Sequence, residues 1–482
     1  MPATVTAVRQ LLAILSSSID VLESTCDAAG VPIPDLHSPF TPESEAFRAI
    51  PAAVEAASLI GAAALQIEAI VTPPTVTLYR IVGGAFRSAT IRAVSESGVT
   101  ELLREAGPQG MHVRDIGAAN GQDPEKLARF LRMLATHHIY REVSPDVFAN
   151  TRISSLLDTG KSSREVISHP DKKHRGSTGL SALISHHLDV VFKAAAVSWE
   201  TLDDPKTRHS GDPLDSPFSR SIGKRQDMWA HFKENTLRGE RFGIAMTGME
   251  KMQPQDAIIT AFPWSTLPAK AKIVDVGGGV GTSCLSLARH FPQFELVLQD
   301  LPQTIKHARE VWEEKLPGVV QSGRVTLQEH DFFTAQPQKD ATLFLLRQIL
   351  HDWSDPYCVK ILSQLWDAAA PDTTLLIMDS LVPLACHDAP APTGSISESA
   401  VPGAAAKEAP APLLANYGAT NEMAYTIDMV MFFMFNAQER TFLHFQKLLA
   451  SAGWKIVKVH RQAGDSTFMQ CIEARKVEKP EV

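Results

Sequence analysis

Residues Lys272–Thr282 read K-I-V-D-V-G-G-G-V-G-T, and this stretch decides how the second half of the chain folds. It begins with a short β-branched, apolar segment that is typical of a buried parallel strand. A cluster of glycines follows, and then a pattern at Ser283–His290 that predicts a helix. Because glycine carries no Cβ, the chain can turn sharply here and a bulky ligand can lie against its backbone. The stretch therefore predicts a ligand-binding turn at the carboxyl end of a strand, as in open α/β sheets.

The spacing of these glycines decides between classes of ligand. A dinucleotide fingerprint needs G-x-G-x-x-G, but its last position is occupied by Thr282. No Gly-Lys-Ser/Thr follows, as a phosphate-binding P-loop would need. The acidic residue two positions before the first glycine gives D-x-G-x-G-x-G, which resembles the first motif of class I methyltransferases that use S-adenosylmethionine. The predicted cofactor residues in this motif are Asp275, Gly277, Gly278 and Gly279. A glycine-rich turn without a ligand is the alternative.

Strands and helices alternate from residue 255 onward. After a first strand at Ile273–Val276, the pattern predicts strands at Glu295–Gln299, Val325–Gln328, Ala341–Leu346, Thr374–Met378, Trp454–His460 and Phe468–Ala474. Seven strands in this order match the methyltransferase sheet, so residues 255–482 are expected to form a Rossmann-like class I methyltransferase domain of the α/β class. A run rich in Ala and Pro at about 384–418 interrupts this domain. We expect a flexible insertion there, either a passive loop or a lid over the active site.

The part of the chain before this domain is expected to be mainly helical. Residues 1–97 are predicted to form a helical dimerisation region, in which the Ala-rich helix Pro51–Val71 allows close helix contacts, with simple core packing of this helix as the alternative. Residues 98–160 predict a winged-helix dimerisation domain, with a second helix at Pro124–His137 and a two-stranded wing. Residues 161–254 predict a helical linker that contributes to the substrate pocket.

Composition narrows the class of partner and the compartment. A net charge of −8 argues against a general binder of nucleic acid or of anionic membranes. The winged-helix pattern keeps open a DNA-binding regulator, or a ligand sensor with an inactive methyltransferase-like domain, although the second helix has no basic excess. The 5 Cys are scattered without a C-x-x-C pair, which favours a reducing compartment and, with no targeting segment evident, the cytoplasm. The apolar segment Ala52–Val71 contains Glu55, Gln66 and Glu68, so no membrane span is expected.

Acidic and aromatic residues follow the next two strands at the same edge of the sheet. Asp300 and Leu301 come at the end of the second strand, about twenty residues after the glycines, where an acidic side chain can accept hydrogen bonds from ribose hydroxyls. Asp331 and Phe332 follow the third strand, where a carboxylate can contact an adenine amino group and a ring can pack on the base. Three strand ends with these residue types predict an adenosine-containing cofactor.

The fourth strand leads into L-L-R-Q-I-L-H-D-W-S-D, which brings His351 to the same edge. Histidine suits a general base because its ordinary pKa lies near the working pH. Other segments that form this edge carry Asp352, Asp355, Asp379 and Glu439. A carboxylate that is bonded to one ring nitrogen fixes the tautomer and stabilises the imidazolium that forms.

The ordered motifs D-V-G-G-G-V-G, Q-D-L-P, H-D-F-F, L-H-D-W-S-D, M-D-S-L-V-P and Q-E-R-T resemble the plant and fungal O-methyltransferases of the caffeic acid type, from about Gly98 to the C-terminus. The fungal members of secondary metabolism match the character of this chain best. The resemblance implies a homodimer, with S-adenosylmethionine as cofactor and S-adenosylhomocysteine as product. It implies His351 as the catalytic base, flanked by Glu439 and by Asp379, which stands where the family usually has Glu. Arg347 stands where the family often has a Lys that contacts the cofactor.

The predicted reaction is a direct displacement at the methyl group of S-adenosylmethionine, without a metal. His351 removes the proton of a phenolic hydroxyl, and the oxygen then attacks the methyl group. We expect a small aromatic or polyketide-type acceptor in an apolar pocket, with substrate residues Phe232, Met246, Met249, Asp352, Met429 and Phe432. Core packing is the alternative for those in the helices before the glycine motif. A nicotinamide-dependent reductase is the other enzymatic alternative, which the incomplete G-x-G-x-x-G disfavours.

Overall fold

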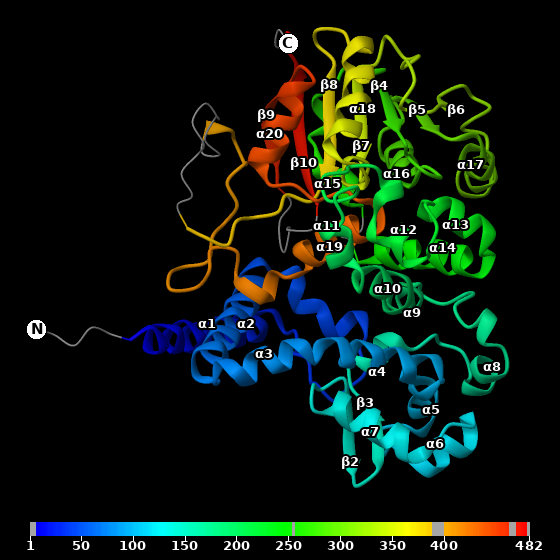
Figure 1. Ribbon diagram of the computed structural model, residues 1–482. Coiled ribbons are helices and arrows are strands. Elements are labelled where there is room, and N and C mark those ends of the chain that lie inside the picture. The colour runs from blue at the N-terminus through cyan, green and yellow to red at the C-terminus, as the bar shows by residue number, and fades with distance from the viewer. Residues whose placement is uncertain (1–5, 253–255, 388–399, 462–468, 480–482) are drawn as a thin grey trace, which may run out of the picture. The chain divides into compact units, whose positions relative to one another are not determined.

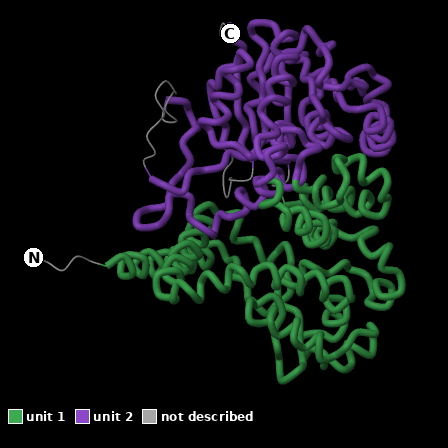
Figure 2. Tube along the Cα trace, in the orientation of Figure 1, with its two compact units in different colours: residues 1–201, 217–253 green, residues 202–216, 254–482 purple. Residues whose placement is uncertain are grey.

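The computed structural model describes residues 6–252, 256–387, 400–461 and 469–479. The chain divides into two compact units, which Figure 2 shows in different colours. Unit 1 comprises Met1–Thr201 and Pro217–Gln253, and unit 2 comprises Leu202–Ser216 and Pro254–Val482. The three N-terminal segments distinguished from the sequence thus fall in one unit, except that residues 202–216 group with the predicted sheet domain.

Unit 2 is built on a seven-stranded sheet with the strand order β6-β5-β4-β7-β8-β10-β9 (Figure 1). The first five strands along the chain pair in parallel, whereas β10 runs antiparallel to both β8 and β9. Their bounds are β4 Lys272–Val276, β5 Glu295–Asp300, β6 Val325–Glu329, β7 Leu343–Arg347, β8 Thr374–Asp379, β9 Trp454–His460 and β10 Gln470–Lys476. All seven predicted strands are confirmed, and their ends differ by at most about two residues. The predicted first residue of the last strand, Phe468, lies outside the described residues.

Helices cover both faces of this sheet, because alternate residues of a strand point to opposite faces. Phe344 and Ile377 pack in one buried cluster with residues of α18 and α20. Their chain neighbours Leu345 and Met378 pack in a second cluster with residues of α15, α16 and α17. The predicted α/β fold class is confirmed. The helices of unit 2 are α15 Ala257–Ala261, α16 Thr282–His290, α17 Pro302–Lys315, α18 Asp355–Ala368, α19 Met423–Phe435 and α20 Phe442–Ser451.

Unit 1 is helical in its described residues, apart from a small sheet with the order β1-β3-β2. The predicted helix, turn, helix and wing are present as α6 Val113–Asn120, α7 Pro124–Ala135, β2 Tyr140–Ser144 and β3 Val147–Asn150. Val99, Leu131 and Phe148 lie in the buried core of this part. The other elements are α1 Ala7–Ala29, α2 Pro51–Val71, α3 Pro74–Val82, α4 Gly84–Glu96, α5 Val99–Ala106, β1 Met111–His112, α8 Ser163–Ser168, α9 Leu180–His186, α10 Phe192–Ala195, α11 Ser198–Asp203 at the unit boundary, α12 Pro217–Ser221, α13 Met228–Glu234 and α14 Thr236–Lys251.

Within the part of the chain that the structure describes, two helical stretches, Pro51–Val71 and Leu180–Asp203, are long and apolar enough to cross a membrane by length and composition alone. A core helix of a soluble protein passes the same test, and half of the most apolar window in the second stretch is buried. This observation by itself is weak support for a membrane span.

The Ala/Pro-rich insertion is packed in its second, described part. Val401 and Ala404 lie in the buried cluster on the α18 and α20 face of the sheet. The carbonyl of Pro402 accepts a hydrogen bond from the N–H of Val459 in β9 at 2.9 Å, and the Arg461 side chain donates to the carbonyl of Gly403 at 2.7 Å. Residues 400–418 thus have fixed packing partners, while residues 388–399 lie outside the described part. The flexibility of the insertion and its role as loop or lid stay predictions.

Candidate active site

The glycine turn lies between β4 and α16, at the carboxyl edge of the parallel strands (Figure 1). Gly277, Gly279 and Gly281 have φ angles of 72°, 63° and 92°, which L side chains rarely adopt. Gly278 has a different constraint, since a Cβ there would lie 2.5 Å from Oδ2 of Asp275. The turn therefore presents bare backbone at this edge, as the sequence predicts.

Asp300 holds the glycine turn against the end of β5. Its Oδ2 accepts the N–H of Gly279 at 2.9 Å, and its Oδ1 accepts the N–H of Leu301 at 2.8 Å. The carbonyl of Gln299 accepts the N–H of Gly277 at 2.8 Å. Asp300 is half-buried and Leu301 is 54% exposed, so a ligand can reach both. A carboxylate has about four lone-pair positions, so Asp300 can also accept hydrogen bonds from a ribose.

Phe332 brings an aromatic ring beside the same turn. A Cβ on Gly277 would lie 3.2 Å from Cε1 of Phe332, whose ring also makes edge contacts with Phe333 and Trp353. The neighbouring Asp331 is exposed and accepts the N–H of Phe333 at 3.0 Å. A ring and an exposed carboxylate side by side after the same strand suit a purine base that carries an amino group.

Two charged residues, Asp275 and Arg347, lie beside the glycine turn. Asp275 is buried, and burial raises its pKa to about 6 against the lowering effects of the Cys284 thiol and the Arg347 guanidinium. Arg347 donates to Oγ of Ser283 at 2.9 Å and thereby joins the end of β7 to the first turn of α16. The cation predicted for the cofactor site thus lies beside the glycine turn.

His351 and Glu439 meet in a short, buried contact. His351 lies in the 3-10 turn Leu350–Asp352 after β7, and Glu439 follows α19. Nδ1 of His351 lies 2.7 Å from Oε1 of Glu439, and the N–H of Glu439 donates to Oδ1 of Asp428 at 2.8 Å. With Nδ1 engaged, Nε2 is the ring nitrogen that remains for proton transfer.

Three carboxylates surround the imidazole of His351. Its Nε2 lies 3.6 Å from Oδ1 of Asp352. Asp379, at the end of β8, is 1% exposed, and neither of its oxygens has a hydrogen-bond partner among the described residues. Burial alone lowers the pKa of His351, but Glu439, Asp352 and, to a smaller degree, Asp379 raise it to about 10. Burial also raises the pKa of Asp379 to about 7, although the charge of His351 opposes this shift. The site therefore holds a strongly basic imidazole.

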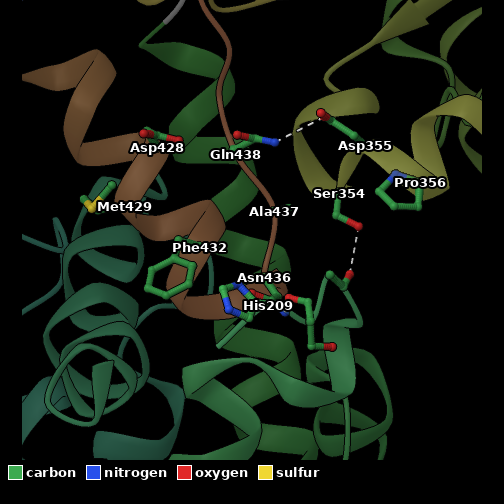
Figure 3. A pocket seen from close by; sticks show the side chains of 12 residues that line it. His209, Ser354, Asp355, Pro356, Asp428, Met429, Phe432, Asn436, Ala437 and Gln438 are labelled. Atoms are coloured by element: carbon green, nitrogen blue, oxygen red, sulfur yellow. Dashed lines mark hydrogen bonds between the residues drawn. The ribbon is translucent and has the colours of Figure 1, made fainter. Parts of the chain in front are cut away.

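A cavity of about 460 Å³ opens in unit 2 beside α19 (Figure 3). Met429 and Phe432, both predicted to contact substrate, line it, whereas Asp352 and His351 do not. The other lining residues come from three segments of the same unit and one position of α19: His209, Ser210, Gly211, Ser354, Asp355, Pro356, Asp428, Asn436, Ala437 and Gln438. Two of the lining residues, Ser354 and Gln438, thus lie close in the sequence to His351 and Glu439.

The other three predicted substrate residues lie in unit 1. Phe232 on α13 is buried, and its ring centroid lies 5.4 Å from that of Phe242 and 6.1 Å from that of His186. Met249 on α14 packs against a small buried cluster, while Met246 is 37% exposed. Packing within unit 1 accounts for Phe232 and Met249, and a substrate role for the three residues stays a prediction.

Two residues that support the site have no role in the sequence analysis. Asp428 orients the Glu439 backbone, and Gln299 accepts hydrogen bonds from the glycine turn. Gln299 acts through its backbone carbonyl, which every residue type has, so the sequence cannot indicate this role. An acidic residue inside the apolar helix M-A-Y-T-I-D-M-V-M-F-F-M-F was the available signal for Asp428.

No group of three or more His, Cys, Asp or Glu side chains in the described residues could hold a metal ion. The five cysteines are free, and four of them are buried.

The fold and this edge together define a class of protein. A seven-stranded sheet with a glycine turn after its first strand and acidic residues after the next two is that of the class I methyltransferases. A family model described as an O-methyltransferase domain matches residues 199–399. A second model, described as an O-methyltransferase dimerisation domain, matches residues 79–160.

Relatives with similar sequences identify the family. A protein of Phanerochaete chrysosporium named 4-O-methyltransferase 1 is 52% identical, over 97% of this chain and 98% of that protein. From the same fungus, 3-O-methyltransferase 2 is 29% identical, over 93% of this chain and 94% of that protein. The solved structure of LepI in complex with SAM matches with a TM-score of 0.65 at 17% identity, over 97% of this chain and all of that one, which shows the shared fold. The chain belongs to the S-adenosylmethionine-dependent O-methyltransferases.

Proposed function

We propose that the protein moves the methyl group of S-adenosylmethionine to a phenolic hydroxyl of a small aromatic or polyketide-type acceptor, without a metal. The observation that carries this proposal is the buried contact between His351 and Glu439 at the edge that also holds the glycine turn. A base held beside a methyl donor is what the methylation of a weakly acidic hydroxyl requires.

The residues at the strand ends support S-adenosylmethionine as the donor. Asp300 can accept hydrogen bonds from the ribose hydroxyls, and Asp331 from the adenine amino group, while the ring of Phe332 packs on the base. Arg347 supplies a cation beside the turn. When bound, S-adenosylmethionine supplies a methyl group on a positively charged sulfur.

His351 receives the proton of the acceptor at Nε2. The surrounding carboxylates raise the pKa of His351 above its ordinary value, so the ring accepts the proton of a weakly acidic phenol more readily. The neutral imidazole is favoured while a cation is bound nearby, since like charge opposes the imidazolium. Glu439 holds Nδ1 and stabilises the imidazolium once it has formed.

The cavity beside α19 supports an aromatic acceptor. Met429 and Phe432 give it apolar walls, and Asp428 and Asn436 give it polar groups that can orient a ligand. Two relatives are named for oxygen positions, 4-O and 3-O, which supports a ring hydroxyl as the methylated group. The resemblance to fungal members supports a role in secondary metabolism.

A homodimer is part of the proposal. The dimerisation model matches residues 79–160, which begin within α3. This helix has no buried residue, and Leu78, Tyr79 and Ile81 are each more than 60% exposed. An apolar surface of this kind supports association with a second copy of the chain.

A panel of phenols, incubated with S-adenosylmethionine in a chelating buffer, tests the proposal. We expect at least one phenol to gain the mass of one methyl replacing a hydrogen, at a rate that the chelator does not change. Methylation of thiols or amines alone, or activity that needs an added divalent cation, would contradict it.

A further inference from the structure

Arg440 follows Glu439 directly, and its side chain is fully buried. The proposed reaction gives it no role. A buried guanidinium is costly unless its donors are used, so the partners of Arg440 indicate what it does.

Two of these partners are backbone carbonyls on either side of His351. Nη1 of Arg440 donates to the carbonyl of Leu350 at 2.8 Å, and Nη2 donates to the carbonyl of Trp353 at 2.7 Å. Both carbonyls belong to the short 3-10 turn that presents the imidazole, or to the residue that ends it. The Leu350 carbonyl already accepts the N–H of Trp353 at 3.3 Å within the turn, and the guanidinium adds a donor from outside the turn to each of the two carbonyls.

The charge of Arg440 is matched by Asp355 at the start of α18. Oδ1 of Asp355 accepts from Nε of Arg440 at 3.0 Å and from Nη2 at 2.9 Å. Oδ2 of the same carboxylate lies 2.7 Å from Nε2 of His444. Asp355 is therefore held on both oxygens and keeps the guanidinium plane in one orientation.

The backbone of Arg440 also contacts the segment that follows Asp379. Arg440 pairs with Leu381 in an isolated parallel bridge, and its carbonyl accepts the N–H of Val382 at 3.0 Å. Leu381 lies two residues after Asp379. One residue thus touches the segments that carry His351 and Asp379, and it adjoins Glu439 in the chain.

We propose that Arg440 is a positioning residue that sets the contact between His351 and Glu439. It holds the turn of His351 through two carbonyls, while its own backbone carries Glu439 and is tied to the end of β8. This inference rests on the proposed role of His351 as base. It assigns Arg440 no contact with substrate or cofactor.

The substitution Arg440→Lys tests the inference. A lysine ammonium is a point charge and cannot serve both carbonyls and the carboxylate with the geometry of the guanidinium fork. We expect kcat to fall about 10-fold to 100-fold, because small displacements of a catalytic group cost this much. The KM for S-adenosylmethionine should change less than twofold. Arg324→Lys is the control, since the Arg324 side chain donates to the carbonyl of Ala288 on the other face of the sheet.

The pH profile separates positioning from general destabilisation. A longer distance between His351 and Glu439 weakens the charge effect that raises the pKa of His351, so the acidic limb of kcat should move to lower pH in Arg440→Lys. A loss of kcat that only follows the fraction of folded protein, with the limb unmoved, would overturn the inference. Asp355→Asn releases the guanidinium while keeping its charge, and it should move the limb in the same direction if the lysine variant does not fold.

The same substitution in a His351→Gln background separates this inference from the proposed function. If Arg440 acts through His351, Arg440→Lys should lower the residual rate of that variant less than twofold. A full 10-fold effect there would overturn the positioning role and leave the role of His351 standing. Wild-type turnover in His351→Gln alone would instead overturn the proposed function, and this inference with it.

Discussion

At the scale of single residues, the chemistry depends on charge around one imidazole. His351 is buried with Glu439, Asp352 and Asp379 near it, and these carboxylates outweigh the effect of burial on its pKa. Coulombic attraction at low effective dielectric favours the protonated ring. A cation bound nearby favours the neutral form of the ring. The carboxylates then favour the transfer of a proton to that neutral ring.

Removing one of these charges should move the pH dependence of the reaction. Glu439→Gln keeps an oxygen near Nδ1 but removes the negative charge that raises the pKa of His351 most. We expect the acidic limb of kcat against pH to move down by at least about one unit, and the plateau to fall roughly 10-fold to 1000-fold as imidazolium stabilisation is lost. Steady-state kinetics from pH 5 to 10 measure both. Glu473→Gln, at the distant pair of His460 and Glu473, should leave the limb in place.

Asp379 predicts a pH dependence of stability. Its folded pKa, about 7, lies above the value of about 4 in an unfolded chain, so the folded state holds the proton more tightly. Between these values the unfolded state binds fewer protons, and the free energy of unfolding falls as pH rises, by up to about 1.4 kcal/mol per unit. Urea denaturation of wild type and Asp379→Asn checks this. The fall between about pH 4 and 7 should be shallower in the variant, and equal slopes would contradict the prediction.

At the scale of elements, the strands and the glycine turn could be predicted because local pattern and tertiary position agree. The first strand is buried on both faces, and the turn after it needs glycine for backbone geometry. The break between α3, which ends at Val82, and α4, which begins at Gly84, could not be predicted from the hydrophobic pattern. Glycine has low helix propensity, and hydrophobic periodicity passes over such a break.

Some of the site residues could be predicted from the sequence and others could not. His351 and Glu439 could be predicted because they lie in recognisable motifs at strand and helix ends, and their contact confirms their proximity. The bond between Arg440 and the carbonyls around His351 could not, because it joins segments roughly ninety residues apart through backbone atoms. The packing of residues 400–418 also depends on burial against β9, which composition does not encode.

The glycine turn gives a prediction at this scale. In Gly278→Ala the new Cβ would lie 2.5 Å from both Oδ2 of Asp275 and Cδ1 of Leu298, so the turn must shift. We expect the affinity for S-adenosylhomocysteine, measured by calorimetry, to fall at least about 10-fold, because overpacking typically costs 1–3 kcal/mol. Gly243→Ala is the control, since its φ, like that of Gly278, is not positive, and no atom lies within 4 Å of the Cβ. Equal affinities for the two variants would contradict the account.

At the scale of the whole molecule, the surface of α3 bears on assembly. The exposed apolar side chains Leu78, Tyr79, Ile81 and Val82 lie on one short helix with no buried residue. Unit 1 also contains the match to a dimerisation domain. Burial of such a surface against a second copy removes apolar area from water.

Sedimentation measures the assembly directly. We expect the wild-type protein to sediment at twice the chain mass, and Ile81→Glu to sediment at the chain mass, because it places a charge in the apolar surface. Leu237→Glu, at a 57% exposed position of α14, is the control and should remain dimeric. A dimeric Ile81→Glu protein would place the interface elsewhere.

The central claim is that His351 is the base of a methyl transfer, and one pair of variants tests it most directly. His351→Gln is compared with His460→Gln, because both histidines lie within 2.8 Å of a glutamate and their side chains are 11% and 12% exposed. The account predicts that His351→Gln lowers kcat by roughly 10²–10⁴-fold while its affinity for S-adenosylhomocysteine stays within twofold of wild type. His460→Gln should keep both values. Turnover of His351→Gln within threefold of wild type would contradict the account.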